Sequence, residues 1–107
     1  MATYIKIDVH GLEKINHTLW KLFGFICTHY ENKGKNVYIT SIAEGLHRNG
    51  SFHYIGRAID FKRCGFIKKD IRIIINNWCT KYGYDTNDFD LLEYHDKDIF
   101  HLEYDPK

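Results

Sequence analysis

The hydrophobic period of this chain alternates between that of a helix and that of a strand, and the order of the segments limits the folds it can form. Apolar residues recur every three or four positions from about residue 11 to 30, and again from Lys68 to Tyr82. This spacing places them on one face of a helix. Gly83 follows the second segment and is expected to end it. We therefore predict two amphipathic helices, each with one buried face.

Strand signals lie between and after these helices. Residues Val37 to Ile42 are mostly β-branched or aromatic, and a short strand is expected from Ala58 to Lys62. Phe89–Tyr94 and Ile99–Tyr104 alternate in polarity on either side of four turn residues, as in a β-hairpin. Residues 43–54 show no sustained period and are expected to form an ordered loop. This order of elements predicts an α+β domain with helices packed on a small antiparallel sheet.

The length and the charge of the chain limit the number of domains and the classes of partner. Its 107 residues match one ordinary domain, and we treat residues 1–107 as a single unit. Lys and Arg total 15 against 14 acidic residues, so no nucleic-acid partner is expected. No segment approaches the roughly 18 apolar residues that span a membrane, and no signal peptide is recognisable. These features predict synthesis in the cytoplasm, action on the cell wall only after release, and no membrane partner. The absence of an obvious exposed apolar run predicts a monomer.

The cysteines and the histidines of the chain point to different roles. The three cysteines, Cys27, Cys64 and Cys79, are odd in number and far apart, which argues against a disulfide framework and against a zinc finger. Seven histidines are many for this length, and imidazole is a common metal ligand and proton carrier. An isolated histidine is usually structural, so a metal site requires several ligands that the fold brings together.

Three residues form a candidate metal site. His53 lies in the expected loop, Asp60 follows it by seven positions, and Gly56 allows the backbone to turn closely between them. His101 lies on the last expected strand. Two imidazoles and one carboxylate leave the fourth tetrahedral position of a zinc ion open for water. Structural zinc sites are usually closed by four protein ligands, so this set favours catalysis.

The hairpin adds a candidate general base. We place the centre of its turn near Asp96. Glu93 then faces Ile99, and Leu91 faces His101. These four side chains share one face of the sheet, and Glu93 becomes a diagonal neighbour of His101. In this position the carboxylate of Glu93 can take a proton from water at the metal and pass it to a leaving amine.

These residues resemble a known family. The segment Ser-Phe-His-Tyr-Ile-Gly-Arg-Ala-Ile-Asp, residues 51–60, is similar to the S-x-H-x-x-G-x-A-x-D signature of the M15 zinc peptidases. That family includes D-Ala-D-Ala carboxypeptidases and dipeptidases and phage L-Ala-D-Glu endolysin peptidases, and the hedgehog signalling domain shares its fold. Downstream, Glu93 and the run Phe-His-Leu-Glu-Tyr-Asp-Pro at 100–106 resemble the family's ending, in which a catalytic Glu precedes a ligand His. The likeness extends from about Val37 to Pro106.

The resemblance implies roles for individual residues. His53, Asp60 and His101 match the zinc ligands, and Glu93 matches the catalytic base. Asp98, three residues before His101, occupies the place of Glu in the E-x-x-H ending of the dipeptidase branch and is the alternative base. We prefer Glu93 because the expected strand alternation directs it towards the metal, whereas Asp98 falls in the expected turn.

Substrate contacts are implied as well. Ser51 matches a polar residue near the substrate in the dipeptidase branch. No arginine stands at a position known to bind the terminal carboxylate of the substrate, so Arg48 and Arg57 are the candidates for substrate binding. Two features depart from the family. Ile99 stands where many relatives have a histidine two residues before the last ligand, and the spacing from Glu93 to His101 is longer than in the hedgehog-type ending.

The resemblance therefore implies a zinc-dependent peptidase of hedgehog-like, DD-peptidase-like fold. Its expected substrate is the peptidoglycan stem peptide, cut at a bond of the D-Ala-D-Ala or L-Ala-D-Glu type, as by a phage or viral lysis enzyme. The first alternative is a catalytically silent zinc-binding interaction domain, which the likeness to hedgehog permits. The second is an endopeptidase that acts on ordinary proteins.

Overall fold

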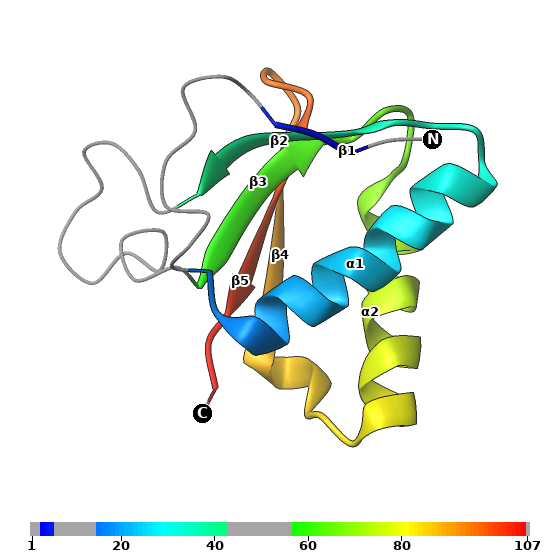
Figure 1. The fold of residues 1–107 in the computed structure, drawn as a ribbon. Helices are drawn as coiled ribbons and strands as arrows, with labels where there is room; N and C mark the ends of the chain where they lie inside the picture. The colour runs from blue at the N-terminus through cyan, green and yellow to red at the C-terminus, as the bar shows by residue number, and fades with distance from the viewer. Residues whose placement is uncertain (1–2, 6–14, 43–56, 107) are drawn as a thin grey trace, which may run out of the picture.

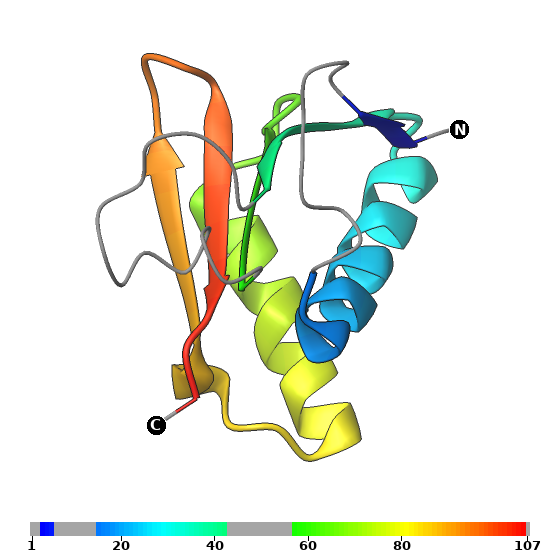
Figure 2. The ribbon, with the colours of Figure 1, turned by 60° about the vertical axis from the view of Figure 1, so that its left-hand side comes forward.

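The computed structural model describes residues 3–5, 15–42 and 57–106. In chain order the elements are strand β1 (Thr3–Ile5), helix α1 (His17–Asn32), strands β2 (Val37–Ile42) and β3 (Ala58–Lys62), helix α2 (Lys68–Tyr82), the short 3-10 helix η2 (Thr86–Asp88), and strands β4 (Phe89–Tyr94) and β5 (Ile99–Tyr104). Both helices lie on the same side of one sheet (Figures 1 and 2). The expected α+β class, with two helices on a mainly antiparallel sheet, is confirmed.

Helix α1 begins where a side chain caps it. The Asn16 side chain accepts a hydrogen bond from the backbone N–H of Leu19 at 3.1 Å. This bond satisfies one of the N–H groups that a helix start leaves without a partner. The helix therefore starts at His17, and the expectation that it includes Ile15 was wrong. The remainder of its expected first turn, residues 11–14, lies outside the described residues.

Helix α2 has the predicted bounds and the predicted end. Gly83 follows it with a φ of 79°, in the left-handed region, and its N–H donates to the carbonyl of Cys79. Glycine adopts this conformation without a Cβ clash, which explains why the helix ends there. The buried face carries Ile71, Ile75 and Trp78. In the part of the chain that the structure describes, no helix has the length and apolar content to cross a membrane.

The sheet has the strand order β1-β2-β3-β5-β4. Strand β1 runs parallel to β2, and the pairs β2–β3, β3–β5 and β5–β4 are antiparallel. The predictions of β2, β3 and both hairpin strands are confirmed, whereas β1 was not predicted. The loop expected over residues 43–54 lies outside the described residues. The three cysteines are free, as their spacing predicted.

The helix-facing side of the sheet forms the hydrophobic core. Phe61 of β3 faces Phe100 of β5, with ring centroids 5.7 Å apart. Phe23 of α1 packs edge-on against Phe61 at 5.1 Å, and all three rings are buried. Side chains alternate along a strand, so Asp60 and His101, the neighbours of these phenylalanines, lie on the opposite face. The core thereby fixes which side chains the other face of the sheet presents.

Candidate metal centre

Asp60 and His101 contact each other across two strands. They are directly opposite in the antiparallel pairing of β3 with β5, and their side chains share the sheet face that points away from the helices. His101 Nδ1 lies 2.6 Å from Asp60 Oδ1, although the residues are 41 positions apart in the sequence. The sheet thus brings two of the three predicted metal ligands together, and metal binding by them stays a prediction.

The surroundings of His101 favour a protonated ring in the absence of a metal. His101 is the one buried polar or charged residue in the described part of the chain. Burial, the largest single influence, would lower the pKa of the imidazole, but hydrogen bonds to Asp60 and Glu103 and their negative charges outweigh it and raise the pKa. Carboxylates accept hydrogen bonds, so both ring nitrogens donate. A metal that binds His101 must therefore displace a proton.

Glu103 is a site residue that the sequence analysis missed. Its Oε1 lies 2.6 Å from Nε2 of His101, the ring nitrogen that Asp60 does not contact. Residues two apart on a strand share a face of the sheet. The His-Leu-Glu spacing at 101–103, on a strand that was predicted, was therefore a signal that could have identified this neighbour.

The chemistry of Asp60 and His101 fits one edge of a zinc site. Carboxylate oxygen and imidazole nitrogen both bind zinc, with bonds of about 2.0–2.2 Å. Two ligand atoms of a tetrahedral ion at that distance lie about 3.3 Å apart, so the observed contact has to open by less than about 1 Å. Among residues 3–5, 15–42 and 57–106, no group of three or more His, Cys, Asp or Glu side chains is arranged to hold a metal. The described residues therefore place two candidate ligands, Asp60 and His101, next to each other.

The other predicted site residues differ in how far the structure describes them. His53, Ser51 and Arg48 lie outside the described residues, so the roles assigned to them stay predictions. Arg57 is half-buried directly before β3, and its carbonyl accepts a hydrogen bond from the N–H of Tyr104 at 2.8 Å. Arg57 therefore lies near the ends of the two strands that carry the pair, and its contact with a substrate carboxylate stays a prediction.

The expected pairing of the hairpin was wrong. Glu93 faces Phe100, whereas His101 faces Leu92. Leu91, expected opposite His101, lies instead on the helix-facing side with Glu93. Glu93 is thus on the opposite face of the sheet from His101, and its role as the base stays a prediction that the sheet does not support.

The cause is the position of the turn centre. Four turn residues separate the strands, so Tyr94 pairs with Ile99 and the centre falls between Asp96 and Lys97 rather than at Asp96. A shift of one residue in the register of a strand moves its side chains to the other face. The argument from strand alternation, which favoured Glu93 over Asp98 as the base, therefore no longer holds.

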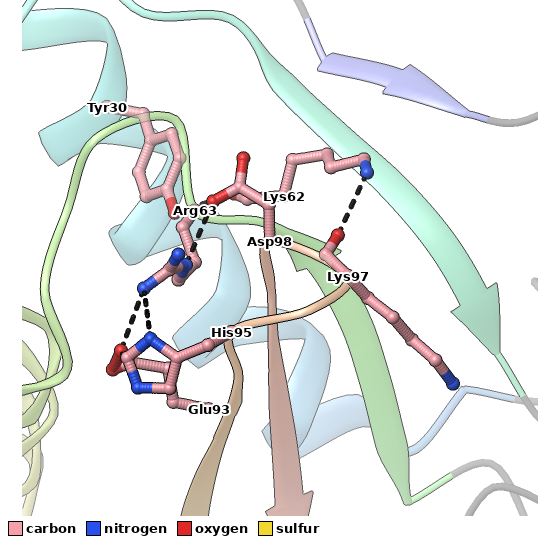
Figure 3. Close-up of polar contacts among 7 residues, drawn as sticks. All are labelled: Tyr30, Lys62, Arg63, Glu93, His95, Lys97 and Asp98. Atoms are coloured by element: carbon pink, nitrogen blue, oxygen red, sulfur yellow. Dashed lines mark hydrogen bonds and ion pairs between the residues drawn. The ribbon is translucent and has the colours of Figure 1, made fainter.

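Both candidate bases contact one arginine, Arg63, which directly follows β3 (Figure 3). Its guanidinium lies 2.8 Å from Glu93 Oε1 and 2.9 Å from Asp98 Oδ1. His95 also contacts the Glu93 carboxylate, at 3.2 Å. In the described part of the chain the polar partners of these two carboxylates are Arg63 and His95, not His101. This cluster joins the segment after β3 to the hairpin turn.

A pocket of about 470 Å³ lies in the helix layer. Aromatic side chains of both helices and of the segment after α2 line it, together with Lys21 and Thr28; they are Phe25, Trp78, Tyr82 and Tyr84. The helices cover one face of the sheet (Figure 2), and His101 lies on the other face, because its neighbour Phe100 faces the helices. This pocket is therefore not part of the candidate metal centre.

No protein-family model matches this chain, and no curated protein or solved structure matches it.

We expect Arg63→Met to lower the free energy of unfolding by about 1–3 kcal/mol. The substitution leaves the Glu93 carboxylate, whose side chain is 11% exposed, without its cation. Loss of the contact with Asp98 adds little to the change in unfolding free energy, because this side chain is 56% exposed and solvent screens its charge. Urea unfolding followed by circular dichroism measures the change.

Lys62→Met is the matched control for this loss. The Lys62 ammonium donates to the carbonyl of Lys97 at 3.1 Å in an exposed position (Figure 3), so its loss should cost less than about 1 kcal/mol. Equal losses for the two variants would contradict a specific role for Arg63.

Proposed function

We propose that this chain is a zinc-dependent peptidase of hedgehog-like fold that hydrolyses peptidoglycan stem peptides, at a bond of the D-Ala-D-Ala or L-Ala-D-Glu type. The contact between Asp60 and His101 carries the proposal. The signature at 51–60 and the chain's ending single out these two residues independently, and they meet at 2.6 Å on one face of the sheet. A carboxylate and an imidazole in this arrangement are suited to share a metal ion.

The chain's own residues would hold and shape this site. Asp60 and His101 would bind the metal together with His53. Bound zinc supplies a Lewis acid that polarises a carbonyl and lowers the pKa of water. The ladder of β3 and β5 keeps Asp60 opposite His101. On the same face Leu92 and Tyr94 are exposed, and the Tyr94 ring lies 6.2 Å from the His101 ring, so they offer an apolar surface to a substrate.

A second candidate function is a catalytically silent zinc-binding interaction domain. The contacts of Arg63 favour it, because Glu93 and Asp98, the two carboxylates considered as general base, both pair with this guanidinium. A general base must come within hydrogen-bond reach of the water that it deprotonates. If no carboxylate reaches that water, the metal would stabilise the domain or a partner contact without hydrolysis.

We expect the zinc-loaded chain to release new amino groups from purified peptidoglycan, and we expect chelation with EDTA to abolish the release. Zinc added back should restore it. Amine assays measure the activity, and mass spectrometry of the released stem peptides identifies the bond. A chain that binds zinc but releases no amines from several wall types is the silent domain. Hydrolysis of casein without hydrolysis of peptidoglycan indicates an endopeptidase for ordinary proteins.

Two isosteric variants in the same assay identify the base. Loss of a general base typically costs about 10²–10⁴-fold in rate without loss of the metal. Glu93 lies on the helix-facing side of the sheet, so we expect Glu93→Gln to keep hydrolysis per folded molecule, and a loss confined to Asp98→Asn would make Asp98 the base. The reverse result would restore Glu93 as the base. Full activity in both variants would exclude both carboxylates.

A further inference from the structure

His101 is held between two carboxylates on opposite edges of its ring. Asp60 contacts Nδ1 from the neighbouring strand β3, and Glu103 contacts Nε2 from the same strand β5, each at 2.6 Å. The side chains of the ring and both carboxylates are at most 22% exposed, so little solvent competes for these contacts. Among the described residues, these two carboxylates contact both ring nitrogens and orient the imidazole.

The two carboxylates cannot have the same role toward a metal. The nitrogens of an imidazole point away from each other, and a metal ion binds only one of them. A metal at Nδ1 lies on the side of Asp60, with Glu103 on the far edge of the ring. The contact to the far nitrogen then decides which tautomer the ring adopts.

We propose that Glu103 is a positioning residue for the metal centre: it accepts the Nε2–H of His101 and so leaves Nδ1 to bind the metal beside Asp60. This inference rests on the proposed metal site, but not on peptidase activity. Two observations favour Asp60 as the ligand and Glu103 as the positioning residue. Asp60 lies directly opposite His101, and it is the carboxylate that the resemblance at 51–60 matches to a zinc ligand. Glu103 contacts the ring nitrogen that Asp60 does not contact, from a position two residues along the same strand as His101.

Glu103→Gln tests this role through metal affinity. We expect it to weaken zinc binding by about 10–100-fold, the usual cost of losing an outer-shell carboxylate. A neutral amide no longer favours a proton on Nε2, and its NH₂ group can donate to that nitrogen and select the wrong tautomer. Competition with a chromophoric chelator measures the dissociation constant, and circular dichroism verifies that the variant is folded.

Asp90→Asn is the matched control. Asp90 of β4 lies directly opposite Glu103 on the same sheet face, so the variant removes the same charge from the same neighbourhood. It should leave zinc affinity within about twofold, because Asp90 faces Glu103, whereas His101 faces Leu92. An equal loss in both variants would mean that Glu103 acts only through general charge, and would overturn the proposal.

A spectroscopic signature separates positioning from direct ligation. In the zinc-loaded protein labelled with ¹⁵N-histidine, we expect His101 to carry its proton on Nε2 and the metal on Nδ1. A metal on Nε2, or unchanged zinc affinity in Glu103→Gln, would overturn the proposal while leaving a zinc site in place. A wild-type chain that binds no zinc would overturn both this inference and the proposed function.

Discussion

Asp60→Asn should weaken zinc binding by more than about 100-fold, beyond what removal of an outer-shell partner typically costs. Asparagine keeps the shape of the side chain but loses the negative charge that binds the metal. The variant also loses the charged partner of His101 Nδ1, which Asp60 contacts at 2.6 Å. Chelator competition measures the zinc affinity, and inductively coupled plasma mass spectrometry of the dialysed protein measures the zinc that remains.

The comparison with Asp90→Asn shows whether this loss is specific to a ligand. Asp90 lies on the same face of the sheet but on β4, and its variant makes the same change in net charge. We expect it to bind zinc like the wild type. Wild-type affinity in Asp60→Asn would remove Asp60 from the ligand set, and with it the principal argument for the metal centre.

Phe61→Ala should lower the free energy of unfolding by about 3–5 kcal/mol, the usual cost of deleting a buried aromatic ring. The Phe61 ring is fully buried and packs against Phe23, Tyr30 and Phe100, with centroids 5.1, 6.1 and 5.7 Å away. Domains of this kind are stable by about 5–15 kcal/mol, so this loss is a large fraction of the stability. Urea unfolding measures the loss.

Leu92→Ala is the control for this effect, because Leu92 is 44% exposed on the opposite face of the sheet. Its loss should be less than about 1 kcal/mol. If Phe61→Ala cost no more than Leu92→Ala, the packing of β3 on α1 would not be the core of the domain. The milder Phe61→Leu should retain zinc binding, since its neighbour Asp60 stays in register.

The elements were predictable because their signals are local. The bounds of β2, β3, α2 and both hairpin strands follow from hydrophobic period, strand propensity and one glycine in the left-handed region. Helix α1 was placed too early, because a stripe that continues into Ile15 does not reveal that Asn16 caps the helix. Strand β1 has only three residues, and so few residues show no period.

The contact between Asp60 and His101 was only partly predictable. The motif singled out both residues, but the hairpin pattern pairs β5 with β4 alone. Strand β5 also pairs with β3, and this pairing brings His101 to Asp60. The pairing depends on the order of strands in the sheet. Strand order is a tertiary property that alternation within one strand does not contain.

The expected position of Glu93 beside His101 was wrong by a single residue of register. Bounds of 94 and 99 for the strand ends already place the turn centre between residues 96 and 97, so the prediction contradicted its own strand limits. The Arg63 contacts depend on how the segment after β3 packs against the turn, and no local pattern reports them. In a β-strand an error of one residue in register is serious, because it assigns every side chain to the wrong face of the sheet.

The most direct test of the metal centre is anomalous diffraction at the zinc edge from a crystal of the zinc-loaded chain. We expect a peak about 2.0–2.2 Å from both a carboxylate oxygen of Asp60 and Nδ1 of His101. A zinc peak away from both residues, or the 2.6 Å contact unchanged with no peak beside it, would contradict the account.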